Sequence, residues 1–117
     1  MQLEEYFTFE TFDTKFGPTE RMRIKGTRIA IEHVVRRYNE GAAPEVILRS
    51  FYPSLTLEQV YATITYYLHN RDTVDDYIKR GEKIADAFYQ EYLSHEPPVV
   101  ARLRSYRAEQ EARQSAP

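Results

Sequence analysis

The residue types that carry out catalysis or bind metals are present in this sequence, but they do not converge. The three histidines, His33, His69 and His95, fall on separate segments, and none belongs to the HExxH pattern of a zinc site. No GxSxG, Walker or GxGxxG motif occurs, and four glycines leave no room for a phosphate-cradling loop. These absences predict a protein that is not an enzyme and that needs no metal or cofactor.

A cluster of three aspartates, Asp72, Asp75 and Asp76, is the nearest approach to a metal site. Carboxylates are also favoured in the first turn of a helix, where the unpaired backbone N–H groups carry partial positive charge. Thr73 stands where it could cap such a helix. We therefore interpret these aspartates as residues of a helix start.

Nucleic-acid binding is the second chemistry that the residues could support. The net charge of −2 is distributed unevenly. Residues 1–20 hold five acids and one base (−4), whereas residues 21–49 hold seven bases and three acids (+4). A basic block of this kind can meet phosphate, although +4 is modest. Its cations are Arg21, Arg23, Lys25, Arg28, Arg36, Arg37 and Arg49.

The basic block leads into a predicted helix-turn-helix in the middle of the chain. Gly41 suits the left-handed position that closes a preceding helix. Pro44 suits the first position of the next helix, and Pro53 ends that helix. Thr56 and Gln59 then form the pattern of a capping box at the start of the second helix. The sequence thus predicts two helices joined by a tight turn.

The second helix of this unit would enter the major groove with its first residues at the base edges. Gln59 suits adenine, whereas Glu58 repels phosphate. No Arg or Lys occurs between Phe51 and Asn70, so a helix-turn-helix that serves only as a scaffold is the competing interpretation. The predicted DNA-binding residues are Arg21, Arg23, Lys25, Thr27, Arg28, Arg49, Thr56, Gln59, Thr63 and Tyr66.

Flanking elements must position this unit. Tyr6–Phe12 and Arg21–Lys25 have the composition and alternation of a β-hairpin that turns near Gly17-Pro18. Ile31–Glu40 has the apolar spacing of an amphipathic helix. The inward stripe predicted for the second helix of the central unit is Leu57, Val60, Tyr61, Ile64, Tyr67 and Leu68. Its outward residues are predicted to be Glu58, Gln59, Ala62, Thr63 and Tyr66.

A long apolar seam follows and ends at Pro97-Pro98. It is longer than one small core can cover, and the last helical stretch, Val99–Arg113, is marginal alone. We expect a dimerisation or partner-binding arm of residues 71–117 beside an N-terminal domain of residues 1–70. The predicted partner-binding residues are Tyr77, Ile84, Phe88, Tyr92, Leu103 and Tyr106.

The composition agrees with a small cytoplasmic protein. Of 117 residues, 42% are hydrophobic and 29% are charged, as is ordinary for a globular chain. There is no cysteine, no apolar run of the roughly 20 residues that span a membrane, and an acidic N-terminus. We predict a mainly α fold with a short N-terminal hairpin, a helix-turn-helix bundle and a long C-terminal arm. Its small core favours a homodimer.

Several of these motifs occur together in one known family. Gly26-Thr27-Arg28-Ile29, Gly41, Pro44–Leu48, Tyr52–Thr56 and Thr65–Tyr67 resemble the bacterial domain of unknown function 433 family. The resemblance covers about residues 20–80 and implies a winged or homeodomain-like helix-turn-helix. It also implies a type II antitoxin that represses its own promoter and blocks a PIN-like ribonuclease toxin through a C-terminal arm.

Together these inferences favour a homodimeric DNA-binding protein of antitoxin type. Its basic strand would hold phosphates, and the face of residues 56–66 would read bases. The alternative is a protein-interaction adaptor of the same fold that does not bind DNA, which the net charge of −2 and Glu58 favour. RNA binding or a nuclease-like role has little support, because no metal-binding pattern is present.

Overall fold

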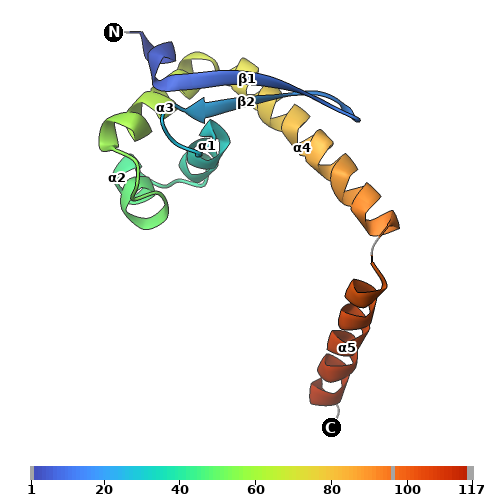
Figure 1. Cartoon of the computed structure of the whole chain (residues 1–117). Coiled ribbons are helices and arrows are strands. Elements are labelled where there is room, and N and C mark those ends of the chain that lie inside the picture. Colours follow the sequence, from blue (N-terminus) through green and yellow to red (C-terminus); the bar gives the residue numbers. More distant parts are fainter. Residues whose placement is uncertain (1, 96, 116–117) are drawn as a thin grey trace. The chain divides into compact units, whose positions relative to one another are not determined.

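The computed structural model describes residues 2–95 and 97–115, and this part of the chain is mainly α-helical after an N-terminal hairpin (Figure 1). The elements are the 3-10 turn η1 (Leu3–Tyr6), β1 (Phe7–Thr14), β2 (Gly17–Ile24), α1 (Ile31–Asn39), α2 (Pro44–Val46), the π-helical turn η2 (Ile47–Phe51), α3 (Leu57–His69), α4 (Arg71–Ser94) and α5 (Pro98–Ser115). The predicted fold class, mainly α with a short hairpin and long C-terminal helices, is confirmed. None of the helices described is long and apolar enough to cross a membrane.

The two strands form an antiparallel hairpin in which Phe7 pairs with Ile24 and Thr14 pairs with Gly17. Lys15-Phe16 is the whole connection between them. Gly17 has a φ of +115°, a backbone conformation that residues with a Cβ rarely adopt. The predicted hairpin is therefore confirmed, and its turn lies just before Gly17 rather than at Gly17-Pro18.

Gly41 closes α1 as its residue type predicted. Its φ is +100°, and its N–H donates to the Tyr38 carbonyl at 3.0 Å. The N–H of Ala42 donates to the Arg37 carbonyl at 3.1 Å. These two bonds make a Schellman motif, which satisfies carbonyls that the end of a helix leaves unpaired. Pro44 is the first residue of α2. Gly41 and Pro44 therefore end one helix and begin the next, as the sequence predicted.

The start of α3 is capped as predicted. The Thr56 hydroxyl accepts the Gln59 N–H at 3.1 Å, and the Gln59 side-chain oxygen accepts the Thr56 N–H at 2.8 Å. Leu55 and Val60, on either side of this cap, are both buried in the core. This is the arrangement of a capping box with a hydrophobic staple. The element before α3 differs from the single helix that the sequence predicted, because it consists of the three-residue α2 and the π-helical turn η2.

The hydrophobic core lies among the hairpin, α1, η2, α3 and the first turns of α4. The Phe7 ring on β1 packs against the Tyr66 ring on α3, with 5.0 Å between centroids. The Tyr77 hydroxyl on α4 accepts the Met22 N–H of β2 at 3.0 Å. Side chains that are almost fully buried are Ile24, Ile31, Ile47, Val34, Val35, Val60, Val74 and Thr63.

The orientation of α3 differs from the predicted one. Of the residues predicted to face outward, three are buried, namely Ala62, Thr63 and Tyr66. Of those predicted to face inward, three are exposed, namely Leu57, Tyr61 and Leu68. The reason is that the hairpin covers a second side of α3, so the helix contacts neighbours on more than one face. The stripe predicted from helical spacing assumed that α3 buries a single face.

The beginning of α4 also differs from prediction. The Val74 N–H donates to the Asn70 carbonyl at 2.9 Å, so the helical bonding pattern begins before Thr73. Thr73 is therefore a residue of the first turn and not the cap. One compact unit spans Met1–Ile84 and a second spans Ala85–Pro117. The first unit extends past the boundary predicted after residue 70, because Val74 and Tyr77 are buried in its core.

Candidate nucleic-acid interface

Side chains of the predicted DNA-binding set shape the turn that follows β2. Arg21 donates from Nη2 to the Arg28 carbonyl at 3.0 Å, and Arg23 donates from Nη1 to the Thr27 carbonyl at 2.9 Å. The Thr27 hydroxyl donates to the Ile24 carbonyl at 2.8 Å. Both arginines thus reach forward from β2 and bind backbone carbonyls of the turn. The predicted basic strand and the Gly-Thr-Arg turn form one structural feature.

The cations of this feature differ in how much of their charge is available. Arg23 is partly buried and forms an ion pair with Glu10 on the neighbouring strand. Arg21, Lys25 and Arg28 are exposed to solvent. The basic face that a polyanion would meet therefore consists mainly of these three residues, which we name the basic turn.

Hydrogen bonds connect the basic turn to the first turn of α3. The Lys25 N–H donates to the Tyr6 carbonyl at 2.8 Å, and the Tyr6 hydroxyl donates to the carboxylate of Glu58. This bond to Glu58 raises the pKa of the Tyr6 hydroxyl. The basic turn is consequently held beside the start of α3. The sequence offered no signal for this contact, because Tyr6 and Glu58 are far apart in the chain.

Two of the predicted base readers cannot reach a ligand. Thr63 has no exposed surface, and its hydroxyl donates to the Gln59 carbonyl at 2.8 Å. Tyr66 is 8% exposed and packs against Phe7 and Phe9 of β1. Burial also raises the pKa of Tyr66. The prediction that Thr63 and Tyr66 face outward is wrong, because both side chains are buried, and β1 of the hairpin packs against Tyr66.

The remaining predicted readers, Thr56 and Gln59, use their side chains to cap α3, as described above. Gln59 is also partly buried. A base contact by either residue would compete with the cap, whose loss costs about 1 kcal/mol of helix stability. Neither residue is therefore well placed for direct readout.

The surface that α3 does expose is apolar and acidic. Leu57, Tyr61 and Leu68 are 39%, 45% and 46% exposed, and Glu58 lies beside Leu57. The Tyr61 hydroxyl donates to Oε1 of Glu45 at 2.5 Å, which lowers the pKa of Glu45 and raises that of Tyr61. Sequence reasoning missed this surface because its apolar spacing was taken for a core stripe. An exposed apolar patch of this kind is typical of contact with another protein.

The predicted partner-binding residues fall into two groups. Tyr77 is 4% exposed, and its hydroxyl accepts the Met22 N–H and donates to Oε2 of Glu32 at 2.7 Å. Burial raises the pKa of Tyr77 well above its ordinary value. Tyr77 is therefore a core residue of the first unit and not a contact for a partner, which corrects that prediction.

The other predicted partner-binding residues lie at or beyond the end of the first unit. Ile84 is half-buried. In the second unit, Phe88 and Tyr92 of α4 are 43% and 48% exposed, and Leu103 and Tyr106 of α5 are 56% and 59% exposed. Large apolar side chains on the second unit thus have much of their surface open to solvent. Among the residues that the structure describes, no group of three His, Cys, Asp or Glu side chains could hold a metal ion.

These features define a mainly α protein in which a β-hairpin and a basic turn precede a helix, a turn and a second helix. Residues 21–67 match the model of the family described as "Protein of unknown function (DUF433)". This segment of the chain belongs to that family, as its motifs predicted, and it contains the basic turn and most of α3. The comparisons with curated proteins and with solved structures found no match.

Proposed function

We propose that this protein is a non-catalytic, DNA-binding helix-turn-helix regulator of antitoxin type. The observation that carries the proposal is the basic turn, whose exposed cations are held beside the first turn of α3. A phosphate backbone that lies along Arg21, Lys25 and Arg28 would bring the start of α3 toward a groove. Arg49 on η2 is a further exposed cation within the same compact unit.

The binding that these residues support is dominated by phosphate contacts. Such contacts fix the orientation of a protein on DNA but carry no sequence information themselves. Because Thr63 and Tyr66 are buried, direct readout by the later turns of α3 is not part of the proposal. We expect affinity that falls steeply with salt and specificity that is modest.

The second part of the proposal concerns the residues of the second unit. Phe88, Tyr92, Leu103 and Tyr106 present the apolar surface that a protein partner would bury. The resemblance of residues 20–80 to the domain of unknown function 433 family implies an antitoxin role, which suggests a PIN-like toxin as that partner. In this proposal the first unit binds the promoter and the second unit binds protein.

A mobility-shift assay on the protein's own promoter at several salt concentrations tests DNA binding. We expect Lys25→Ala with Arg28→Ala to weaken binding at low salt and to reduce the slope of log K against log salt by about two, because two phosphate contacts are lost. The matched control is Lys15→Ala with Lys83→Ala, which removes the same charge from the hairpin connection and from α4, away from the basic turn. Equal binding by both double variants would refute the assigned surface.

A protein-interaction adaptor is the second candidate function, and the exposed face of α3 favours it. Leu57, Tyr61 and Leu68 occupy the position where a recognition helix would present polar and cationic side chains. An affinity for the promoter no greater than for random DNA at physiological salt would select the adaptor over the regulator.

A further inference from the structure

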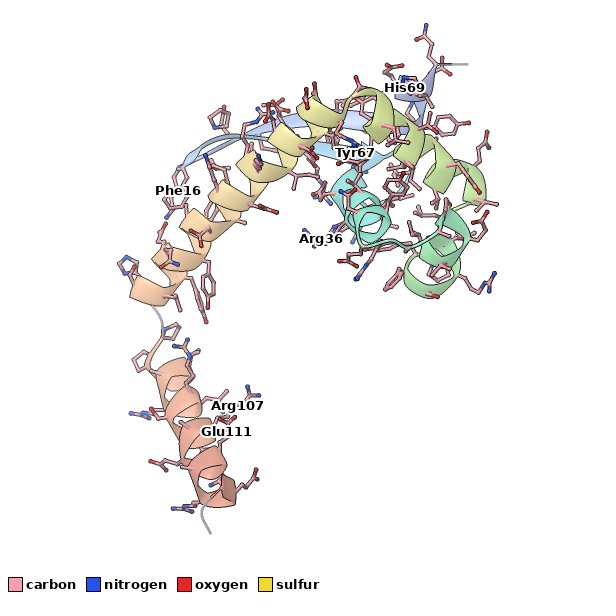
Figure 2. The ribbon with its side chains drawn as sticks, turned by 180° about the vertical axis from the view of Figure 1, so that it is seen from behind. Phe16, Arg36, Tyr67, His69, Arg107 and Glu111 are labelled. Atoms are coloured by element: carbon pink, nitrogen blue, oxygen red, sulfur yellow. The ribbon has the colours of Figure 1, made fainter. Side chains whose placement is uncertain are left out.

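A groove of about 410 Å³ lies between α1 and α4 within the first unit. Val35 of α1 and Ile78 of α4 provide apolar atoms along it, and Arg36, labelled in Figure 2, is another of its lining residues. Four carboxylates and two cations line the groove, so its formal charge is −2. The carboxylates are Glu32, Glu40, Asp75 and Glu82, and the cations are Arg36 and Lys79.

Tyrosine hydroxyls hold two of these carboxylates in place. The Tyr67 hydroxyl donates to Oδ1 of Asp75 at 2.9 Å, and the Tyr77 hydroxyl donates to Oε2 of Glu32 at 2.7 Å. Both tyrosines are buried, so they fix the carboxylates from the inner side of the helices. The groove therefore presents a fixed pattern of negative charge around an apolar strip.

The α5 helix has the complementary pattern. Val99, Leu103 and Tyr106 recur at helical spacing on one face and are 69%, 56% and 59% exposed. At 100° per residue, Arg102 falls on one side of this stripe and Arg107, labelled in Figure 2, falls on the other. No acidic residue occurs between Pro98 and Ala108. Cations thus flank an apolar stripe, as carboxylates flank the apolar strip of the groove.

We propose that the α5 helix of a second copy of this protein docks in the groove between α1 and α4. The Val99–Leu103–Tyr106 stripe lies over Val35 and Ile78, and Arg102 and Arg107 face the carboxylates of the groove. The α5 helix of each copy docks in the groove of the other copy, so the same contact forms twice about a two-fold axis. The doubled contact buries apolar surface that one copy alone leaves in water.

Helix lengths favour a second copy over the same chain as the source of α5. Ile78 lies roughly 24 Å before the end of α4 at Ser94, whereas Tyr106 lies only about 12 Å into α5. An α5 that folded back along its own α4 would place its apolar stripe beside the last turns of that helix. The inference gives a specific contact to the homodimer that the sequence favours, and it does not depend on DNA binding.

Sedimentation equilibrium of the full-length protein tests this contact by charge exchange. We expect wild-type protein to dimerise, and Glu82→Lys or Arg102→Glu alone to raise the dimer dissociation constant tenfold or more, because each change brings like charges together. Combining both substitutions should recover most of the lost affinity. Asp76→Lys is the matched control, because it makes the same charge change on α4 outside the residues that line the groove, and it should leave dimerisation unchanged.

Three results would overturn the proposal. The first is a wild-type protein that stays monomeric at high concentration, because the groove would then bind another protein or nothing. The second is dimerisation that Glu82→Lys leaves unchanged, and the third is a double variant as weak as the singles. Circular dichroism of each variant separates unfolding from loss of the contact. None of these results affects the mobility-shift assay. Failure of the α5 contact can therefore be distinguished from failure of the proposed DNA binding.

Discussion

The two units of this protein use the same residue types for opposite purposes. In the first unit, Tyr66, Tyr67 and Tyr77 are buried, and the hydroxyls of Tyr67 and Tyr77 bind defined partners. In the second unit, Tyr92 and Tyr106 are 48% and 59% exposed. A tyrosine-rich sequence therefore does not by itself indicate a large core. The three named tyrosines of the first unit belong to its core, whereas the two named tyrosines of the second unit lie at its surface.

The largest expected effect comes from the centre of the first unit. Ile24 on β2 has no exposed surface, so Ile24→Ala should reduce the free energy of unfolding by about 2–5 kcal/mol through lost burial and a residual cavity. Urea denaturation at one fixed protein concentration measures this change. A loss below about 1 kcal/mol would show that the hairpin is not part of the core.

A smaller, pH-dependent effect is expected at Tyr77. Tyr77→Phe leaves the buried Met22 N–H without its acceptor and should cost about 1–3 kcal/mol at neutral pH. Burial raises the folded-state pKa of Tyr77 above its ordinary value of 10.0. The stability that the hydroxyl contributes is therefore fully present below pH 10 and is lost as pH rises through the folded-state pKa.

The measurement is the free energy of unfolding of wild-type protein and of Tyr77→Phe between pH 7 and pH 11. The gap between the two proteins should narrow above pH 10. Tyr61→Phe is the matched control, because it removes the same hydroxyl from an exposed side chain and should change stability by about 0.5 kcal/mol or less. A gap that widens with pH would contradict the assignment of Tyr77 as a buried neutral group.

The smallest effect on folding is expected in the second unit. Leu103 is 56% exposed, so Leu103→Ala should change the free energy of unfolding of the monomer by no more than about 0.5 kcal/mol. The same substitution should weaken self-association, because it removes the centre of the α5 stripe. Dilute-solution denaturation and sedimentation equilibrium measure the two effects. A large loss of monomer stability would show that Leu103 is part of a folded core, and it would contradict the assignment of exposed side chains to the second unit.

Much of the fold could be predicted because its signals are local. Gly41 at the end of α1 and the Thr56–Gln59 capping box act within a few residues of their own positions, where backbone geometry decides the outcome. The alternation of β2 likewise buries Ile24 and exposes Arg21 as expected. The basic turn was also predicted as a group of cations, since its members are neighbours in sequence.

The candidate site was predicted less well because it depends on contacts between distant segments. The link from Lys25 through Tyr6 to Glu58 has no sequence pattern, and neither does the groove between α1 and α4. Tyr77 was assigned to a partner surface because its spacing matches the apolar seam of α4. Its burial against Met22 follows from where the hairpin lies.

The sequence by itself determined where α1 ends and where α3 begins, because the Gly41 closure and the Thr56–Gln59 capping box are properties of neighbouring residues. Only the tertiary structure decided which sides of α3 are buried. That helix carries apolar residues on most of its circumference, so helical periodicity does not identify one inner face. Tyr66 is buried against β1 and Thr63 is buried as well, whereas Leu57, Tyr61 and Leu68 remain exposed. Two of the predicted base-reading side chains of α3 are therefore inaccessible, and the surface that remains is largely apolar.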